Sequence, residues 1–79
     1  MRLDKFLKVS RLIKRRTVAK DACDHGKVMI NDKVAKAGTT IAVGDVITIT
    51  FGERVSRYQV LKLAATTKKE DAADMYKPC

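Results

Sequence analysis

The stretch MRLDKFLKVSRLIKRRTVAK at residues 1–20 carries the pattern that decides the fold. Leu3, Phe6 and Leu7 are three and four residues apart, a spacing that places them on one face of a helix starting at about residue 3. Lys5 lies on the opposite face of that helix. The pattern predicts a short amphipathic helix with an apolar side toward a core and a basic side toward solvent.

A second helix is expected after a linker around Leu12 to Arg16. Lys20 faces outward on this helix, and Thr17 is a candidate N-terminal cap because its hydroxyl can accept a hydrogen bond from a first-turn amide. Gly26 is expected to end the helix, since glycine readily adopts the left-handed conformation that helix ends require. The residues expected on the buried side are Val18, Ala19, Ala22 and Cys23.

Strand patterns follow the helices. Val28 and Ile30 alternate with Lys27 and Met29, and Asn31-Asp32 is a two-residue turn of the type that favours positive φ. The chain then returns along Lys33-Val34-Ala35. These residues predict a small β-hairpin.

The strongest strand pattern is Val46 to Phe51, which a turn at Gly44-Asp45 separates from Ile41-Ala42-Val43. A last strand is expected within Val55 to Leu63. The side chains expected on one face of the strongest strand are Ile47, Ile49 and Phe51, and those on the other are Val46, Thr48 and Thr50.

Residues 64–79 are expected to form a tail or a short helix after a main domain of residues 1–63. Thr67-Lys68-Lys69-Glu70 fits the capping-box pattern that begins many helices. Helical spacing continues through Ala72, Ala73 and Tyr76, before Pro78. Two helices followed by strands indicate a compact α+β fold.

The charge is concentrated at one end of the chain. Lys and Arg number 17 against 9 acidic residues, which gives a formal net charge of +8 and a pI near 9.8. Eight of these bases lie in residues 1–20, where Asp4 is the only acidic residue. A charge of one sign gathered in a quarter of the chain favours a binding surface for a polyanion.

Other functional classes find little support in the residues. Cys23 and Cys79 lie far apart and form no CxxC motif, and His25 has no companions at metal-ligand spacing, so we expect no disulfide, no metal and no cofactor. Cys23 is expected to be buried and Cys79 solvated. The chain has neither a secretory signal nor the roughly 20 apolar residues of a membrane span, which predicts a cytoplasmic protein.

Several motifs in a fixed order resemble the S4 RNA-binding domain family over roughly residues 1 to 51. They are Arg2-Leu3-Asp4-Lys5-Phe6-Leu7, Arg16-Thr17 with Ala19, Gly26-Lys27-Val28 with Ile30-Asn31, and Gly44-Asp45. The resemblance implies two N-terminal helices packed on a short twisted β-sheet. The chain departs from the family at Asn31-Asp32, where Asn-Gly is common, and in lacking a proline before Gly44.

The candidate RNA-binding residues are the bases of the two helices and their linker. Arg2 and Arg16 lead, because a guanidinium can hold a phosphate through two parallel hydrogen bonds and because both match the family's RNA-contacting motif. Asp4 is expected to orient a neighbouring base or to cap the first helix. The supporting candidates are Lys5, Arg15, Thr17 and Lys20, followed by Arg11 and Lys14.

Within the S4 family, the opening residues 1–17 and the segment 66–76 resemble a ribosome-associated quality-control branch. That resemblance implies a non-catalytic, monomeric, ribosome-associated factor that contacts large-subunit rRNA and the P-site peptidyl-tRNA. It also implies RqcH as the partner that recruits alanyl-tRNA for C-terminal tailing. Heat-shock-type S4 proteins, which bind released large subunits bearing a nascent chain, are the alternative.

The sequence gives less support to hypotheses other than RNA binding. S4 domains also occur on pseudouridine synthases and tRNA synthetases, but no Ser, Cys or His of this chain has a recognisable activating partner. A DNA-binding role is disfavoured because the second helix carries Asp21 and Asp24 and few side chains that read base edges. The first helix is too short for stable insertion into a membrane surface.

Overall fold

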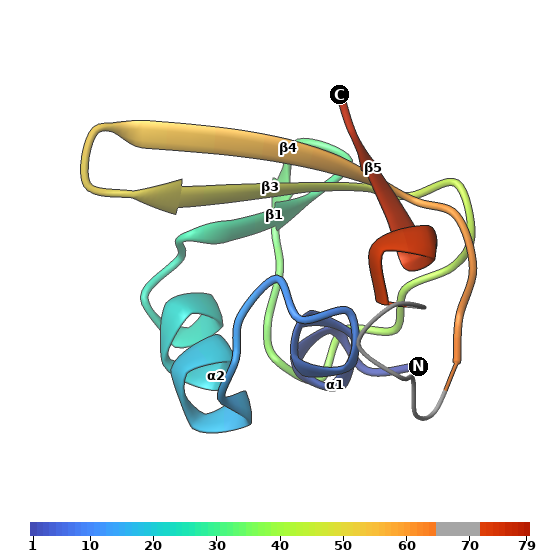
Figure 1. Ribbon diagram of the computed structural model, residues 1–79. Coiled ribbons are helices and arrows are strands. Elements are labelled where there is room, and N and C mark those ends of the chain that lie inside the picture. Colours follow the sequence, from blue (N-terminus) through green and yellow to red (C-terminus); the bar gives the residue numbers. More distant parts are fainter. Residues whose placement is uncertain (65–71) are drawn as a thin grey trace.

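A computed structural model describes residues 1–64 and 72–79, and it shows two helices beneath one antiparallel sheet (Figure 1). The sheet has five strands in the order β2-β1-β3-β4-β5. This arrangement confirms the α+β fold with two N-terminal helices packed on a short sheet. The elements are α1 Leu3–Val9, α2 Arg16–Asp24, β1 Val28–Ile30, β2 Lys33–Val34, β3 Val46–Phe51, β4 Arg54–Val60, a 3-10 turn η1 Ala73–Met75, and β5 Tyr76–Pro78.

The core lies between the helices and the sheet. Leu3, Phe6 and Leu7 of α1 are fully buried, as their spacing predicts. Each large apolar side chain removed from water contributes about 1.5–3 kcal/mol, so this stripe anchors α1. The side chains that meet it from α2, the sheet and η1 include Ala19, Ala22, Cys23, Val28, Ile47, Ile49, Val60 and Met75.

Val18, expected on the buried side of α2, and Phe51, expected on the same strand face as Ile47 and Ile49, both lie at the surface. Val18 is 44% exposed, because Ala19 and Cys23 occupy the buried side of α2 and Val18 lies next to it around the helix. Phe51 is 48% exposed at the end of β3, although Ile47 and Ile49 on the same face are buried. Burial along β3 does not alternate, because Thr48 on the other face is also buried, and it does not extend to the last residue of the strand.

The ends of α2 differ in how well the sequence predicts them. Gly26 has φ +71, its N–H donates to Cys23 O, and the N–H of Lys27 donates to Ala22 O, which is the expected glycine-ended helix terminus. The expected cap at Thr17 is wrong. Arg15, with extended φ and ψ, occupies the N-cap position without a side-chain cap bond, so Thr17 falls inside the helix.

The hairpin at Asn31-Asp32 has the geometry that the sequence predicts. Both residues have positive φ, 51° and 67°, as a two-residue turn between right-twisted strands requires. The Asn31 side chain also donates to Asp45 Oδ1 at 3.1 Å and accepts the Val46 N–H at 3.0 Å. Asn31 thereby joins the hairpin turn to the start of β3, which the sequence alone does not reveal.

The C-terminal residues contradict the expected helix at Tyr76. A single 3-10 turn over Ala73–Met75 is followed by β5, which pairs with the edge of β4. The unpaired backbone groups of that edge are satisfied by the added strand, and the Tyr58 and Tyr76 rings pack edge to face with centroids 5.3 Å apart. The capping-box pattern at residues 67–70 lies outside the described residues.

The last strand expected within Val55 to Leu63 corresponds to β4, which spans Arg54–Val60 and is followed by β5 rather than ending the sheet.

Of the two cysteines, Cys23 is buried and Cys79 is exposed, as expected. Among the described residues, no helix is both long enough and apolar enough to span a bilayer.

Replacing Asp32 with glycine is expected to stabilise the protein by about 1 kcal/mol, because only glycine adopts positive φ without a steric cost. The measurement is urea unfolding of Asp32→Gly beside the parent chain. Asp32→Ala is the control: it also removes the carboxylate but keeps the strained φ, so it should be no more stable than the parent. Equal stability of the glycine and alanine variants would contradict the explanation.

Candidate nucleic-acid interface

The N-terminus of α1 is held by a neighbouring loop. The N–H of Leu3 donates to Thr39 O at 2.9 Å, the N–H of Asp4 donates to Ala37 O at 3.1 Å, and Arg2 forms a β-bridge with Thr40. These bonds satisfy first-turn amides that a helix leaves unpaired. As a result, backbone contacts with residues 37–40 fix the position of Arg2 and Asp4.

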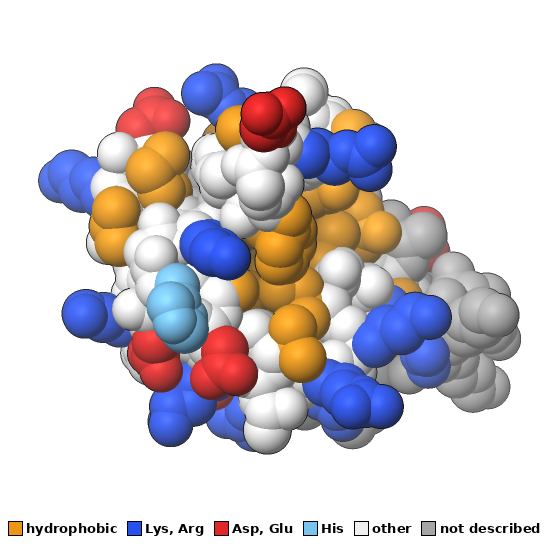
Figure 2. All heavy atoms as spheres, turned by 90° about the vertical axis from the view of Figure 1, so that its left-hand side faces the viewer, with side chains coloured by type: hydrophobic (Ala, Val, Ile, Leu, Met, Phe, Trp, Pro, Cys, Tyr) orange, Lys and Arg blue, Asp and Glu red, His pale blue; other side chains and the backbone are white. Residues whose placement is uncertain are grey.

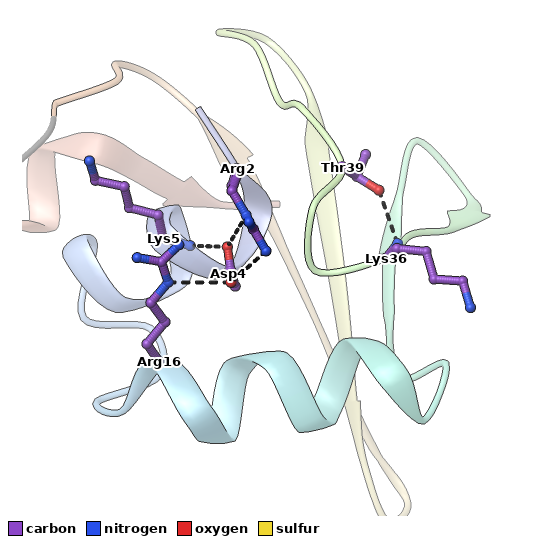
Figure 3. Close-up of polar contacts among 6 residues, drawn as sticks. All are labelled: Arg2, Asp4, Lys5, Arg16, Lys36 and Thr39. Atoms are coloured by element: carbon purple, nitrogen blue, oxygen red, sulfur yellow. Dashed lines mark hydrogen bonds and ion pairs between the residues drawn. The ribbon is translucent and has the colours of Figure 1, made fainter.

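The carboxylate of Asp4 is the centre of a polar cluster (Figure 3). Arg2 Nε donates to Asp4 Oδ1 at 3.2 Å, and Arg2 Nη2 donates to Oδ2 at 3.3 Å. Arg16 Nε, from the first residue of α2, also donates to Oδ2 at 3.3 Å. The backbone N–H of Lys5 completes the set by donating to Oδ1 at 2.8 Å. We call Arg2, Asp4, Lys5 and Arg16 the Asp4 cluster.

The cluster resolves the two roles considered for Asp4. Asp4 orients bases, since both arginines pair with it. It does not occupy the N-cap of α1, which is Arg2, but its acceptance of the Lys5 N–H satisfies one first-turn amide.

The ionisation of Asp4 follows from these contacts. Burial of the carboxyl works to raise its pKa, but the hydrogen bonds from Arg16 and the Lys5 N–H, together with the charges of Arg16 and Arg2, outweigh burial. The net effect lowers the pKa below its ordinary value of 3.8. Asp4 is therefore a carboxylate at neutral pH, which is the form that holds the two arginines.

The two guanidinium groups lie between the protein and solvent. The side chains of Arg2 and Arg16 are 55% and 46% exposed, whereas that of Asp4 is 4% exposed. Asp4 therefore binds the inner edges of the arginines, and donors remain on their outer sides. Paired guanidinium groups held in this way suit phosphate oxygens, which accept parallel N–H bonds.

The remaining sequence candidates are exposed around the two helices. In the described part of the chain, no hydrogen bond or ion pair joins their side chains to the Asp4 cluster. Lys20 lies one helical turn after Arg16 on α2, whereas Thr17 is the next residue of that helix. The structure thus brings together Arg2, Lys5 and Arg16, with the other candidates spread over the surface at Arg11, Lys14, Arg15, Thr17 and Lys20.

Arg11 has an unusual backbone conformation. It follows Ser10, the C-cap of α1, and has φ +63, in the left-handed region that favours glycine. Its N–H donates to Lys8 O, and the N–H of Ile13 donates to Leu7 O, which turns the chain toward α2. An arginine at this position costs conformational energy that a glycine would not.

Sequence reasoning missed the contribution of the loop that follows β2. A side chain at Gly38 would lie 3.9 Å from Arg2 Nη2, so the loop backbone passes beside the guanidinium of Arg2. The neighbouring turn is closed by the Lys36 N–H donating to Thr39 Oγ1 at 2.9 Å, and the Lys36 side chain points away from the Asp4 cluster (Figure 3). The available signal was the small-residue run Ala37-Gly38-Thr39.

A separate shallow groove of about 230 Å³ lies beside α2. Val18, Ala22 and Phe51 give it apolar walls. Figure 2 shows hydrophobic side chains gathered in a hollow on this side of the molecule, with Lys and Arg side chains around its edge. The polar residues of the groove include His25, which is the C-cap of α2 and has Nδ1 2.6 Å from Asp21 O.

Comparison with known proteins places this chain in a family. The model of the S4 domain matches residues 1–47. The RQC P-site tRNA stabilizing factor of Bacillus subtilis (strain 168) is 57% identical over 76 residues, which cover 96% of this chain and 88% of the relative. The chain belongs to the S4 domain family, in the branch of the RQC P-site tRNA stabilizing factors.

Other relatives agree with this placement. The factor of the same name from Streptococcus pneumoniae is 53% identical over 76 residues, covering 96% of this chain and 86% of the relative. Among solved structures, trimeric heat shock protein 15 of Vibrio cholerae superposes with a TM-score of 0.91 at 28% identity. The superposition covers 100% of this chain and 81% of the heat shock protein chain, so the S4-type fold is shared.

Acid is expected to destabilise the protein through Asp4. Because the folded state lowers the pKa of Asp4, its contribution to stability is present above the unfolded pKa near 3.8 and is lost as pH falls through the lower folded value. Urea unfolding between pH 6 and roughly pH 2 should therefore show a decline below about pH 4. The decline should be smaller in Asp4→Asn, and an identical decline in both chains would contradict this explanation.

Arg11→Gly is expected to raise the free energy of unfolding by about 1 kcal/mol while weakening RNA binding. The gain comes from relieving positive φ, and the loss comes from removing one guanidinium. Arg11→Ala separates the two effects, since it should weaken binding equally without the gain in stability. Thermal unfolding measures the change in stability, and titration with large ribosomal subunits measures the change in binding.

Proposed function

We propose that the protein is a non-catalytic RNA-binding factor of ribosome-associated quality control. It binds obstructed large ribosomal subunits and contacts both large-subunit rRNA and the P-site peptidyl-tRNA. By holding that tRNA, it supports C-terminal alanine tailing by RqcH. The observation that carries the proposal is the Asp4 cluster, with two outward-facing arginines, in a chain 57% identical to a P-site tRNA stabilizing factor.

The charge distribution supports a phosphate ligand. Binding to an RNA backbone releases counterions in proportion to the number of phosphates contacted, so clustered bases supply affinity without reading sequence. Phe6 is buried in the core and offers no ring face to a base, and Tyr58 packs edge to face with Tyr76 on strands β4 and β5 rather than on the two helices. Shape and phosphate recognition therefore suit this surface better than recognition of particular bases.

The proposed RNA-binding surface consists of the exposed bases of α1, α2 and the segment between them. Arg2 and Arg16 are the principal contacts because Asp4 already holds them in place. The protein acts in the cytoplasm as a monomer on the ribosome, with no need for DNA or a membrane. The supporting contacts are Lys5, Arg11, Lys14, Arg15, Thr17 and Lys20.

The second candidate is a heat-shock-type role on released large subunits that carry a nascent chain. It draws support from the TM-score of 0.91 with heat shock protein 15, although identity is 28% there against 57% for the P-site factor. Alanine tailing distinguishes the two functions. Tailing by RqcH on stalled subunits in vitro should need this protein under the first proposal and should proceed without it under the second.

The Arg2→Ala plus Arg16→Ala variant is expected to lose roughly 100-fold in affinity for large subunits bearing peptidyl-tRNA, as two charge-assisted contacts disappear. The measurement is co-sedimentation through a sucrose gradient at physiological salt, with empty subunits run in parallel. Selective binding to the obstructed subunit supports the proposal, whereas equal binding to both would leave only a general rRNA-binding role.

The matched control removes two arginines from β4, as Arg54→Ala plus Arg57→Ala. Net charge changes by the same amount, but both residues are exposed on a different element from the Asp4 cluster. This control should retain most of the binding. If the two double variants bind equally poorly, charge alone matters and the assigned surface is wrong.

A further inference from the structure

The Asp4 cluster places a negative charge within a surface that is proposed to bind negatively charged phosphate. Asp4 is the only acidic residue in residues 1–20, and it lies at the centre of the surface proposed to bind phosphate. A carboxylate near a polyanion repels it, so Coulomb energy alone predicts that removing this charge would tighten binding. The position of Asp4 between two arginines suggests a different outcome.

We propose that Asp4 is a positioning residue for RNA binding, whose carboxylate holds Arg2 and Arg16 as one paired guanidinium site for the RNA phosphate backbone. The inference rests on the proposed function, since it takes RNA as the ligand. It adds a role for a residue that itself makes no attractive contact with phosphate.

The donors of each arginine divide between Asp4 and solvent. A guanidinium has five N–H donors, and within residues 1–64 and 72–79 Arg2 uses two groups, Nε and Nη2, on Asp4 whereas Arg16 uses Nε. Both Nη groups of Arg16 and Nη1 of Arg2 remain for a ligand. Because both arginines contact the same carboxylate, these outer donors are held near one another.

Holding the arginines before RNA arrives reduces the entropic cost of binding. A free arginine side chain occupies many rotamers, and fixing it at an interface opposes association. Arg2 comes from the segment before α1 and Arg16 from the start of α2, and within residues 1–64 and 72–79 their side chains are joined only through hydrogen bonds to Asp4. If only a fraction of the molecules have both arginines in the arrangement that binds RNA, the apparent affinity falls in proportion to that fraction.

The decisive variant is Asp4→Asn, measured by titration of large ribosomal subunits bearing peptidyl-tRNA over a range of KCl concentrations. Although the variant is more positive by one charge, we expect binding to weaken about tenfold. Asp24→Asn makes the same charge change at the exposed end of α2 and is expected to bind as tightly as the parent or slightly tighter. Asp4→Asn binding at least as tightly as the parent overturns the inference.

A merely structural role for Asp4 makes a different prediction, which a double-mutant cycle tests. In a chain that already carries Arg2→Ala and Arg16→Ala, Asp4→Asn should no longer weaken binding, because no arginines remain to be positioned. If Asp4→Asn weakens binding equally in both backgrounds, it acts through overall folding and the positioning role is wrong. Thermal unfolding of each variant accompanies the titrations.

A second variant covers the case in which Asp4→Asn is too unstable to assay. Arg16→Lys keeps the charge and leaves Asp4 in place. In arginine, the Nε–H can bind the carboxylate while the two Nη groups remain for phosphate, whereas lysine has a single ammonium group and cannot divide its donors in this way. We expect it to bind several-fold more weakly than the parent with an unchanged net charge. Parent-like binding by Arg16→Lys overturns the inference.

Titration of a structured RNA hairpin in parallel separates this inference from the proposed function. If the parent chain binds the hairpin with the same dependence on Asp4 but ignores obstructed subunits, the proposed function fails and the positioning role stands. If the parent selects obstructed subunits but Asp4→Asn binds them normally, the positioning role fails and the proposed function stands.

Discussion

Burial of the apolar stripe of α1 is the constraint on which the rest of the structure depends. Leu3, Phe6 and Leu7 have no exposed surface, and they bring α2 and the sheet around a common core. In the described part of the chain, these three are among the largest of the fully buried side chains, so a chain of 79 residues depends strongly on them for its core. Once this stripe is buried, the polar side of a seven-residue helix must face outward, together with the start of α2.

The same burial creates the problem that Asp4 solves. Asp4 is the second residue of α1, and the residue as a whole, backbone included, is 2% exposed. Its charge is therefore removed from most of the surrounding water. Two arginines and a backbone N–H compensate it, and the balance favours the ionised form. Stabilising the buried carboxylate therefore places two arginines beside each other at the surface, so the contacts that the folded carboxylate needs are the same ones that we propose prepare the arginines for RNA.

Prediction from sequence succeeded where the cause is local and failed where it is not. The turn at Asn31-Asp32 and the helix end at Gly26 depend on the φ preferences of a few residues, and both have the expected geometry. Thr17 did not become a cap because the N-cap lies two residues earlier, at Arg15, and the helix begins at Arg16, whose side chain reaches Asp4. Tyr76 left the expected helix because the exposed edge of β4 offers backbone partners that a sequence pattern cannot show.

The sequence by itself determined the helix pair, the strongest strand, the burial of Cys23 and the concentration of bases near the N-terminus, because periodicity and composition report these directly. Only the tertiary structure decided which bases act together. Arg2 and Arg16 are far apart along the chain, and their meeting at Asp4 requires α1 and α2 to pack at one relative position. That position is set by side-chain packing in the shared core, which no local pattern of residues encodes.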